Sequence, residues 1–122
     1  MSLDGTQSAR CILAKLLLEQ AEHSSEIEMR MSISRMYYAV FHVASVLTGV
    51  ADHGNMPGAL DEIEVGLGKQ YKRLRDLRSK ADYAPKFEEL GINDWQSFRD
   101  EMTKARTLFE LIESLVEVQD GR

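Results

Sequence analysis

The sequence is poor in cysteine and proline. Cys11 is the only cysteine among the 122 residues, and proline occurs only at positions 57 and 85. A single cysteine cannot form an internal disulfide, so we expect a reduced intracellular compartment and a buried, inert thiol. The scarcity of proline leaves room for long helices.

Other absences exclude further classes of protein. No run of 18 apolar residues is present, so we expect no membrane-spanning segment. The first residues, MSLDGTQ, lack the basic and apolar regions of a signal peptide, and we expect a cytoplasmic protein. The formal net charge of −5 argues against a protein that coats nucleic acid with its whole surface. The three histidines lack the spacing of metal ligands, and there is no glycine-rich phosphate loop, so we expect neither a metal nor a cofactor.

Residues 27–47 form the stretch around which the chain is organised. Its apolar residues step by four, three, four and three, which places five of them on one face of a helix: Ile33, Tyr37, Val40, Ala44 and Leu47. Arg35, Tyr38 and His42 fall on the opposite face, which is also partly apolar. A helix that is apolar almost all round is normally central. We therefore expect it to be covered on both sides, with Arg35 and His42 in a semi-buried polar stripe.

The rest of the chain also has helical periodicity. We expect a mobile tail at residues 1–6 and one domain at residues 7–120. The first two helices are predicted at residues 7–23 and from the capping signal Ser24-Ser25 to Gly49. A third is predicted at 57–65 and a fourth at 69–80, after Gly66 and Gly68. The last helix is predicted to begin after an N-cap at Asn93. The apolar residues of the last helix are Trp95, Phe98, Met102, Ala105, Phe109, Ile112 and Val116. Residues 82–91 are expected to be a connection. We find no strand pattern, so the fold class is all-α, a four- to five-helix up-and-down bundle.

A basic segment interrupts this acidic chain between positions 69 and 80. Its six cations are Lys69, Lys72, Arg73, Arg75, Arg78 and Lys80, against one acid, Asp76. One interpretation is a patch that binds phosphate groups, for which the planar fork of arginine is well suited. The alternative is a solvated helix face on which Arg75 or Arg78 pairs with acids of the last helix.

Arg35, Tyr38 and His42 are a second candidate site. An imidazole close to a guanidinium could act as a general base and charge stabiliser in the cleavage of a phosphodiester. A histidine on a core helix can equally be a hydrogen-bonded packing residue, and the sequence leaves both interpretations open.

Three segments occur in an order typical of one known family. They are SRMYYAVFH at residues 34–42, His53-Gly54, and LRSKADY at residues 77–83. They resemble the S-R-x-Y-Y-A-x-F-h helix, the following H-G loop element and the L-R-x-x-A-D-Y segment of the HEPN domain (higher eukaryotes and prokaryotes nucleotide-binding). With the last helix, the resemblance covers about residues 8–118.

The resemblance implies a HEPN-like bundle that is commonly a homodimer. It also implies a minimal nucleotidyltransferase as partner, in a toxin–antitoxin pair. Many HEPN domains are metal-independent endoribonucleases with an R-x4-6-H motif. After Arg78 this chain has Asp82 and Tyr83 where that motif has histidine, whereas Arg35 and His42 match its spacing on a different helix.

We therefore expect a nucleotide- or RNA-binding or regulatory module. Six residues would line its polar cleft: Arg35, Tyr38, His42, Arg78, Asp82 and Tyr83. In this cleft the arginines would hold phosphate, Asp82 would orient an arginine, and the tyrosines would stack on a base. One alternative is a metal-independent ribonuclease that uses His42 with Arg35 or Arg78. Another is a structural dimerisation domain without a ligand, in which the cleft is a satisfied Arg–Asp–Tyr network.

Overall fold

The computed structural model describes the backbone of residues 5–119 and the side chains of residues 26–119. This part of the chain contains α1 (Gly5–Thr48), α2 (Met56–Ile63), α3 (Leu67–Tyr83), the 3₁₀ helix η1 (Phe87–Leu90) and α4 (Trp95–Gln119), with no strand. The prediction of an all-α fold is confirmed. Of the predicted tail, residues 1–4 lie outside the described residues, while residues 5 and 6 belong to α1. The prediction for the thiol of Cys11 also lies outside the described side chains.

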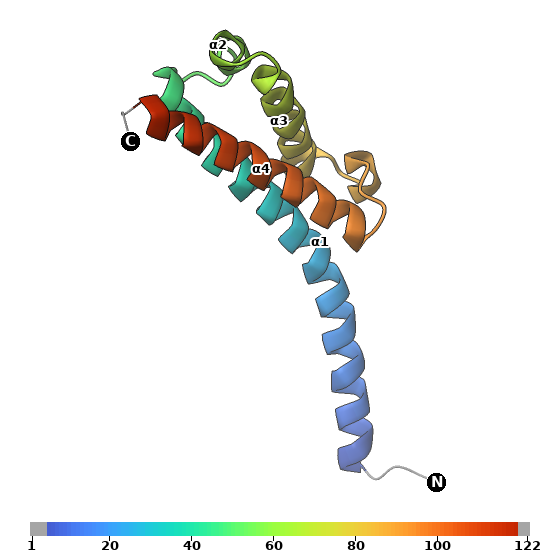
Figure 1. Cartoon of the computed structure of the whole chain (residues 1–122). Helices are drawn as coiled ribbons and strands as arrows, with labels where there is room; N and C mark the ends of the chain where they lie inside the picture. Colours follow the sequence, from blue (N-terminus) through green and yellow to red (C-terminus); the bar gives the residue numbers. More distant parts are fainter. Residues whose placement is uncertain (1–4, 120–122) are drawn as a thin grey trace.

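α1 is one continuous helix of 44 residues where the sequence predicted two. The capping signal at Ser24-Ser25 does not end a helix, because no glycine or proline accompanies it and serine is tolerated inside a helix. In Figure 1 the first half of α1 extends away from the other helices, and the second half lies within the bundle. The first predicted helix therefore does not fold back over the second.

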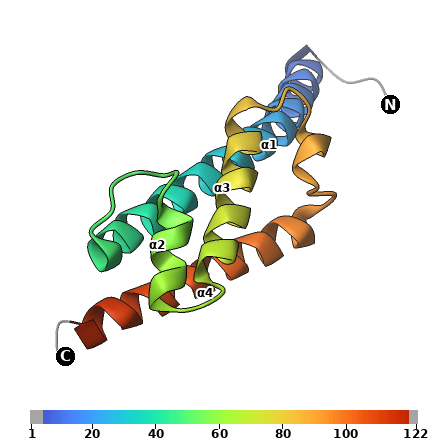
Figure 2. The same ribbon diagram turned by 90° about the horizontal axis from the view of Figure 1, so that it is seen from above.

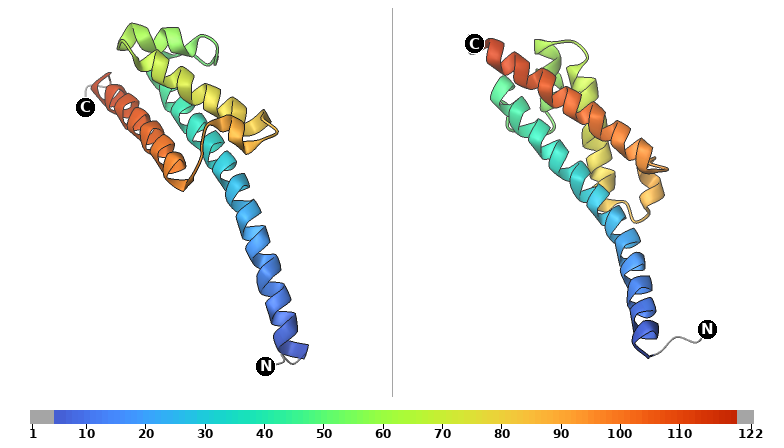
Figure 3. Two further views of the ribbon diagram at one scale, coloured as in Figure 1. Left: turned by 90° about the vertical axis from the view of Figure 1, so that its right-hand side faces the viewer. Right: turned by 60° about the horizontal axis from the view of Figure 1, so that its bottom comes forward.

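The helices form two layers. α1 packs against α4 and α3, and α2 packs against α3. Seen from above, α2 and α3 lie over the pair formed by α1 and α4 (Figure 2). The second half of α1 and α4 run in the same direction while α3 runs against them (Figure 3, left). Within residues 5–119, no helix combines the length and the hydropathy that a membrane crossing requires.

The predicted apolar face of α1 forms the centre of the core. Four of its five residues are fully buried and Leu47 is 5% exposed. The main core cluster joins them, except Ile33, to residues of the other helices: Met56, Leu60, Leu67, Tyr71, Leu74, Ala105, Leu108 and Ile112. Ile33 belongs to a second cluster at the other end of α3, with Ala81, Leu90, Ile92 and Phe98.

The opposite face of α1 is open, so the prediction of a helix covered on both sides is wrong. Arg35 and His42 are exposed rather than held in a semi-buried stripe. Four large apolar side chains on α1 are exposed as well: Ile27, Met31, Tyr38 and Val46. The physical reason is that residues 7–23, predicted as a separate helix, continue as α1, while α3 and α4 pack on the core side.

Gly66 and Gly68, which the sequence placed before a helix, have different roles where α2 and α3 meet. Gly66 has a φ of +98°, which favours glycine, and it precedes α3. Gly68 instead lies inside α3, where an added Cβ would lie 2.2 Å from the carbonyl oxygen of Pro57. Asp61 of α2 accepts hydrogen bonds from the backbone N–H groups of Gly66 and Gly68, at 3.2 and 2.8 Å. These contacts start α3 two residues earlier than predicted.

The ends of α3 and α4 also differ from the predictions. α3 continues to Tyr83, so Asp82 is helical rather than part of a connection, and residues 87–90 of that connection form η1. Asp94, not Asn93, caps α4, since its Oδ1 accepts a hydrogen bond from the N–H of Ser97 at 2.7 Å. This contact lowers the pKa of Asp94. Trp95 was expected in the core seam, yet it is 55% exposed beside Phe98.

Candidate functional site

Arg78 is the centre of a polar network between α1 and α3. Its Cζ lies 4.8 Å from the ring centroid of Tyr37 and 5.4 Å from that of Tyr38, both on α1. The two rings meet edge to face, with centroids 5.3 Å apart. A guanidinium in this position is attracted by the negative ring faces. Arg78 is therefore held against α1 by two aromatic side chains.

Asp82 holds the same guanidinium of Arg78 from its own helix. One turn along α3, its Oδ2 accepts a hydrogen bond from Nη1 of Arg78 at 3.3 Å. Nε of Arg78 is buried and has no hydrogen-bond partner among the described residues. Burial opposes the charge of the guanidinium, but the hydrogen bond to Asp82 and the neighbouring Tyr37 and Tyr38 outweigh it and raise the pKa of Arg78. The cation is thus permanent and its orientation is fixed.

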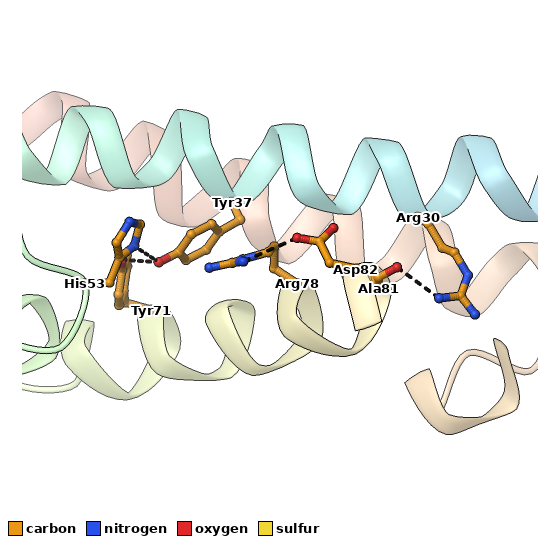
Figure 4. A network of polar contacts seen from close by, with 7 residues as sticks. All are labelled: Arg30, Tyr37, His53, Tyr71, Arg78, Ala81 and Asp82. Atoms are coloured by element: carbon orange, nitrogen blue, oxygen red, sulfur yellow. Dashed lines mark hydrogen bonds and ion pairs between the residues drawn. The ribbon is translucent and has the colours of Figure 1, made fainter. Parts of the chain in front are cut away.

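A chain of hydroxyls leads from this network into the core. The hydroxyl of Tyr37 lies 2.7 Å from that of Tyr71 on α3 and is hydrogen-bonded to Nδ1 of His53 (Figure 4). The imidazole stacks on the ring of Phe41, with centroids 4.0 Å apart. Burial and the bond to Tyr37 raise the pKa of Tyr71 far above its ordinary value, so its hydroxyl stays protonated.

The loop between α1 and α2 folds back so that His53 lies against α1. Asp52 accepts hydrogen bonds from the N–H of Gly54 at 2.9 Å and from Nδ2 of Asn55 at 2.6 Å. Nη1 of Arg75 donates to the carbonyl oxygen of His53 at 3.3 Å, which ties the loop to α3. His53 is therefore held by α1 through its imidazole and by α3 through its backbone carbonyl.

A hollow of about 350 Å³ opens at the end of this network. Its lining comes from both helices: Ile27, Arg30, Met31, Ser34, Arg35, Ala81 and Asp82. Arg30 is engaged at the end of α3, since its Nη1 donates to the carbonyl oxygens of Ala81 and Ala84 at 2.9 and 2.8 Å. Arg35, by contrast, is exposed at the edge of the hollow. The arrangement places an exposed cation on α1 in the same hollow as Asp82 on α3, the carboxylate that pairs with Arg78.

Four of the six predicted cleft residues lie on the same side of the bundle. Arg78 contacts both Tyr38 and Asp82, and Arg35 shares the hollow with Asp82. The other two lie elsewhere. His42 is exposed, with its ring beside that of Phe41. Tyr83 is 76% exposed at the end of α3.

Tyr37, Tyr71 and His53 belong to the network but were absent from the predicted site. The helical periodicity assigned both tyrosines to the core, where they do lie. The available signal was that a buried tyrosine hydroxyl needs a hydrogen-bond partner. His53 was the candidate for that partner, because it lies in the loop that follows α1.

The fold divides the basic segment of α3 between two faces. Arg75 and Arg78 face α1 and pair with acids of their own helix, Asp76 at 4.0 Å and Asp82 at 3.3 Å. The predicted alternative, in which either of them pairs with the last helix, is wrong. Arg73 does so instead, with its Nη2 2.6 Å from Oε1 of Glu101.

No group of three or more potential metal ligands from His, Cys, Asp and Glu lies within the described part of the chain. Comparisons with protein-family models, curated proteins and solved structures found no match to this chain. The resemblance to HEPN domains therefore stays a prediction.

Proposed function

We propose that this chain is a HEPN-type module that binds a nucleotide or RNA in the groove between α1 and α3. One observation carries the proposal: Arg35 on α1 and Asp82 on α3 line the same hollow, and Asp82 pairs with Arg78, whose guanidinium lies over the ring of Tyr38. Phosphate binding needs cations with free donors, and base binding needs an accessible aromatic face. The groove offers both within one helix pair.

The residues have separate roles in this proposal. Arg35 is exposed and closes on a phosphate group as a mobile cation. Arg78 is held by Asp82 and provides a positively charged group beside the groove. Tyr38 is 40% exposed and provides a ring on which a base stacks.

We further propose that the module is a homodimer and that it regulates, or is regulated by, a nucleotidyltransferase-fold partner in a toxin–antitoxin-like pair. This part rests on the resemblance of residues 34–42, 53–54 and 77–83. Sedimentation of the purified chain tests the dimer, and co-purification with a co-expressed nucleotidyltransferase encoded next to it tests the partner.

The binding proposal is tested with a fluorescent single-stranded RNA in EDTA, followed both by anisotropy and on a denaturing gel. Arg35→Ala and Tyr38→Ala should each weaken binding by about 5- to 150-fold, because a lost charge-assisted bond or base stack is worth about 1–3 kcal/mol. Arg106→Ala is the matched control, since it removes an exposed arginine from α4.

Two outcomes would contradict the proposal. Equal affinities of the wild type, Arg35→Ala and Tyr38→Ala would remove the groove as the binding site. RNA cleavage in EDTA that disappears in His42→Ala would replace the binding module with the ribonuclease.

A further inference from the structure

The outer face of α3, opposite the groove, carries a second set of cations. Four basic side chains and two acidic ones line a hollow between α3, η1 and α4: Lys69, Lys72, Arg73, Lys80, Asp76 and Glu101. None of these six contacts Arg78, and only Asp76 pairs with a residue of the α1-facing side, Arg75 at 4.0 Å. The hollow is therefore a separate surface.

The charge on this face is only half compensated. Lys69, Lys72 and Lys80 are exposed, while Arg73 is paired with Glu101. Glu101 is also 3.7 Å from Nζ of Lys104, so one carboxylate is shared between two cations. Four cations and two carboxylates in the lining give a local charge of +2 (4 − 2) in a chain whose net charge is −5.

The spacing of these cations makes a linear array. Lys69 and Lys80 are 11 residues apart on one straight helix, which corresponds to about 16 Å at 1.5 Å per residue. Lys72 and Arg73 lie one turn after Lys69. A row of flexible ammonium groups of this length matches a charged polymer better than one small ligand.

The side chains of the hollow favour a phosphate backbone over an acidic protein. Lysine is depleted at protein–protein interfaces, whose central anchors are aromatic or arginine residues. Here the apolar part of the lining consists of Leu77 and Leu90, with no aromatic ring. Lysines acting as point charges bind phosphates without reading bases.

We infer that the outer face of α3 binds the phosphate backbone of single-stranded RNA, independently of base sequence. The inference deepens the proposed function and rests on it, because the same strand would occupy the α1–α3 groove. Lys80 on the outer face and Asp82 beside the groove are two residues apart near the end of α3. A strand of several nucleotides can therefore pass around this end of α3 and contact both surfaces, whereas a mononucleotide reaches the groove alone.

The test compares two double variants and two probes. Lys69→Ala/Lys80→Ala removes two cations from the outer face, and Arg99→Ala/Arg106→Ala removes two exposed cations from α4. The probes are adenosine 5′-monophosphate, measured by calorimetry, and a fluorescent oligouridylate of about 12 nucleotides, within the usual site size. Each is titrated at several KCl concentrations.

The lysine variant should bind the oligouridylate more weakly. The slope of log affinity against log salt concentration should be smaller in magnitude by about 1.4. Each of the two lost phosphate contacts with a single strand accounts for about 0.7 of this change. Its affinity for the mononucleotide should equal that of the wild type, and the arginine variant should keep the full salt slope.

Each contrary result has a defined meaning. An unchanged slope in the lysine variant, or an equal loss in the arginine variant, would overturn the inference. Binding of a polyglutamate peptide without any RNA binding would overturn it in favour of an acidic protein partner. If the wild type failed to bind the mononucleotide while the lysine variant still lost its salt slope, the groove would be rejected and the outer face retained.

Discussion

The hydroxyl of Tyr37 on α1 lies 2.7 Å from the hydroxyl of Tyr71 on α3, and both side chains are fully buried. This contact joins two helices whose surrounding contacts are apolar, and it extends to the surface through His53. The polar network beside the proposed groove is thus connected directly to the core.

Tyr37→Phe should lower the free energy of unfolding by about 1–3 kcal/mol, because it leaves the buried Tyr71 hydroxyl without this partner. Urea denaturation followed by circular dichroism measures the change. Tyr83→Phe is the control, since that residue is 76% exposed, and it should have no effect. Tyr37→Phe/Tyr71→Phe should cost less than the sum of the two single variants, and strict additivity would show that the hydroxyls do not interact.

Gly68→Ala should destabilise the fold by about 1–3 kcal/mol through overpacking, since its Cβ would clash with the backbone of α2 at Pro57 and with Asp61. Gly58→Ala is a matched control inside α2, where a Cβ meets no atom within 4 Å. It should be neutral or stabilising by up to about 1 kcal/mol, as expected for alanine in a helix. Equal thermal midpoints for the two variants would contradict the close approach of α2 and α3.

Arg78→Met should lower the free energy of unfolding by about 1–2 kcal/mol, the range for a cation over aromatic rings in a partly desolvated site. Methionine keeps much of the length of the side chain but loses both the charge and the bond to Asp82. Arg99→Met, at an exposed position of α4, should leave stability unchanged. If the two variants were equally stable, the network around Arg78 would not contribute to the stability of the fold.

Asp94→Ala should lower the thermal midpoint at pH 7 by a few degrees, because α4 loses its N-terminal cap. The hydrogen bonds from Ser97 lower the pKa of Asp94 in the folded state. Its contribution is therefore fully present above the unfolded pKa of about 4, and it is lost as the pH falls through the lower folded value. The difference between the wild type and Asp94→Ala should shrink in scans below about pH 4. Asp94→Asn keeps a capping side chain without a titrating group, so its difference from Asp94→Ala should be independent of pH in this range.

Local periodicity accounts for much of the fold. The steps from Ile33 to Leu47 predicted the buried face of α1 because a helix brings every third or fourth residue to the same side. The same pattern located α2, α3 and α4 to within a few residues. In α4 it was wrong at two positions. Trp95, at the start, continues the apolar spacing yet is half exposed, and Leu108, in the middle and outside the predicted seam, is buried.

What the sequence by itself determined is the class of fold, the core face of α1 and the concentration of positive charge in α3, all of which depend on neighbours within a few turns. Only the tertiary structure decided that residues 24–25 continue a helix and that the back of α1 is open. It also decided that the six cations of α3 face two different ways, and that Tyr37, Tyr71 and His53 meet. The reason is that these outcomes depend on which helices pack on which side, a choice made by contacts between residues far apart in the chain.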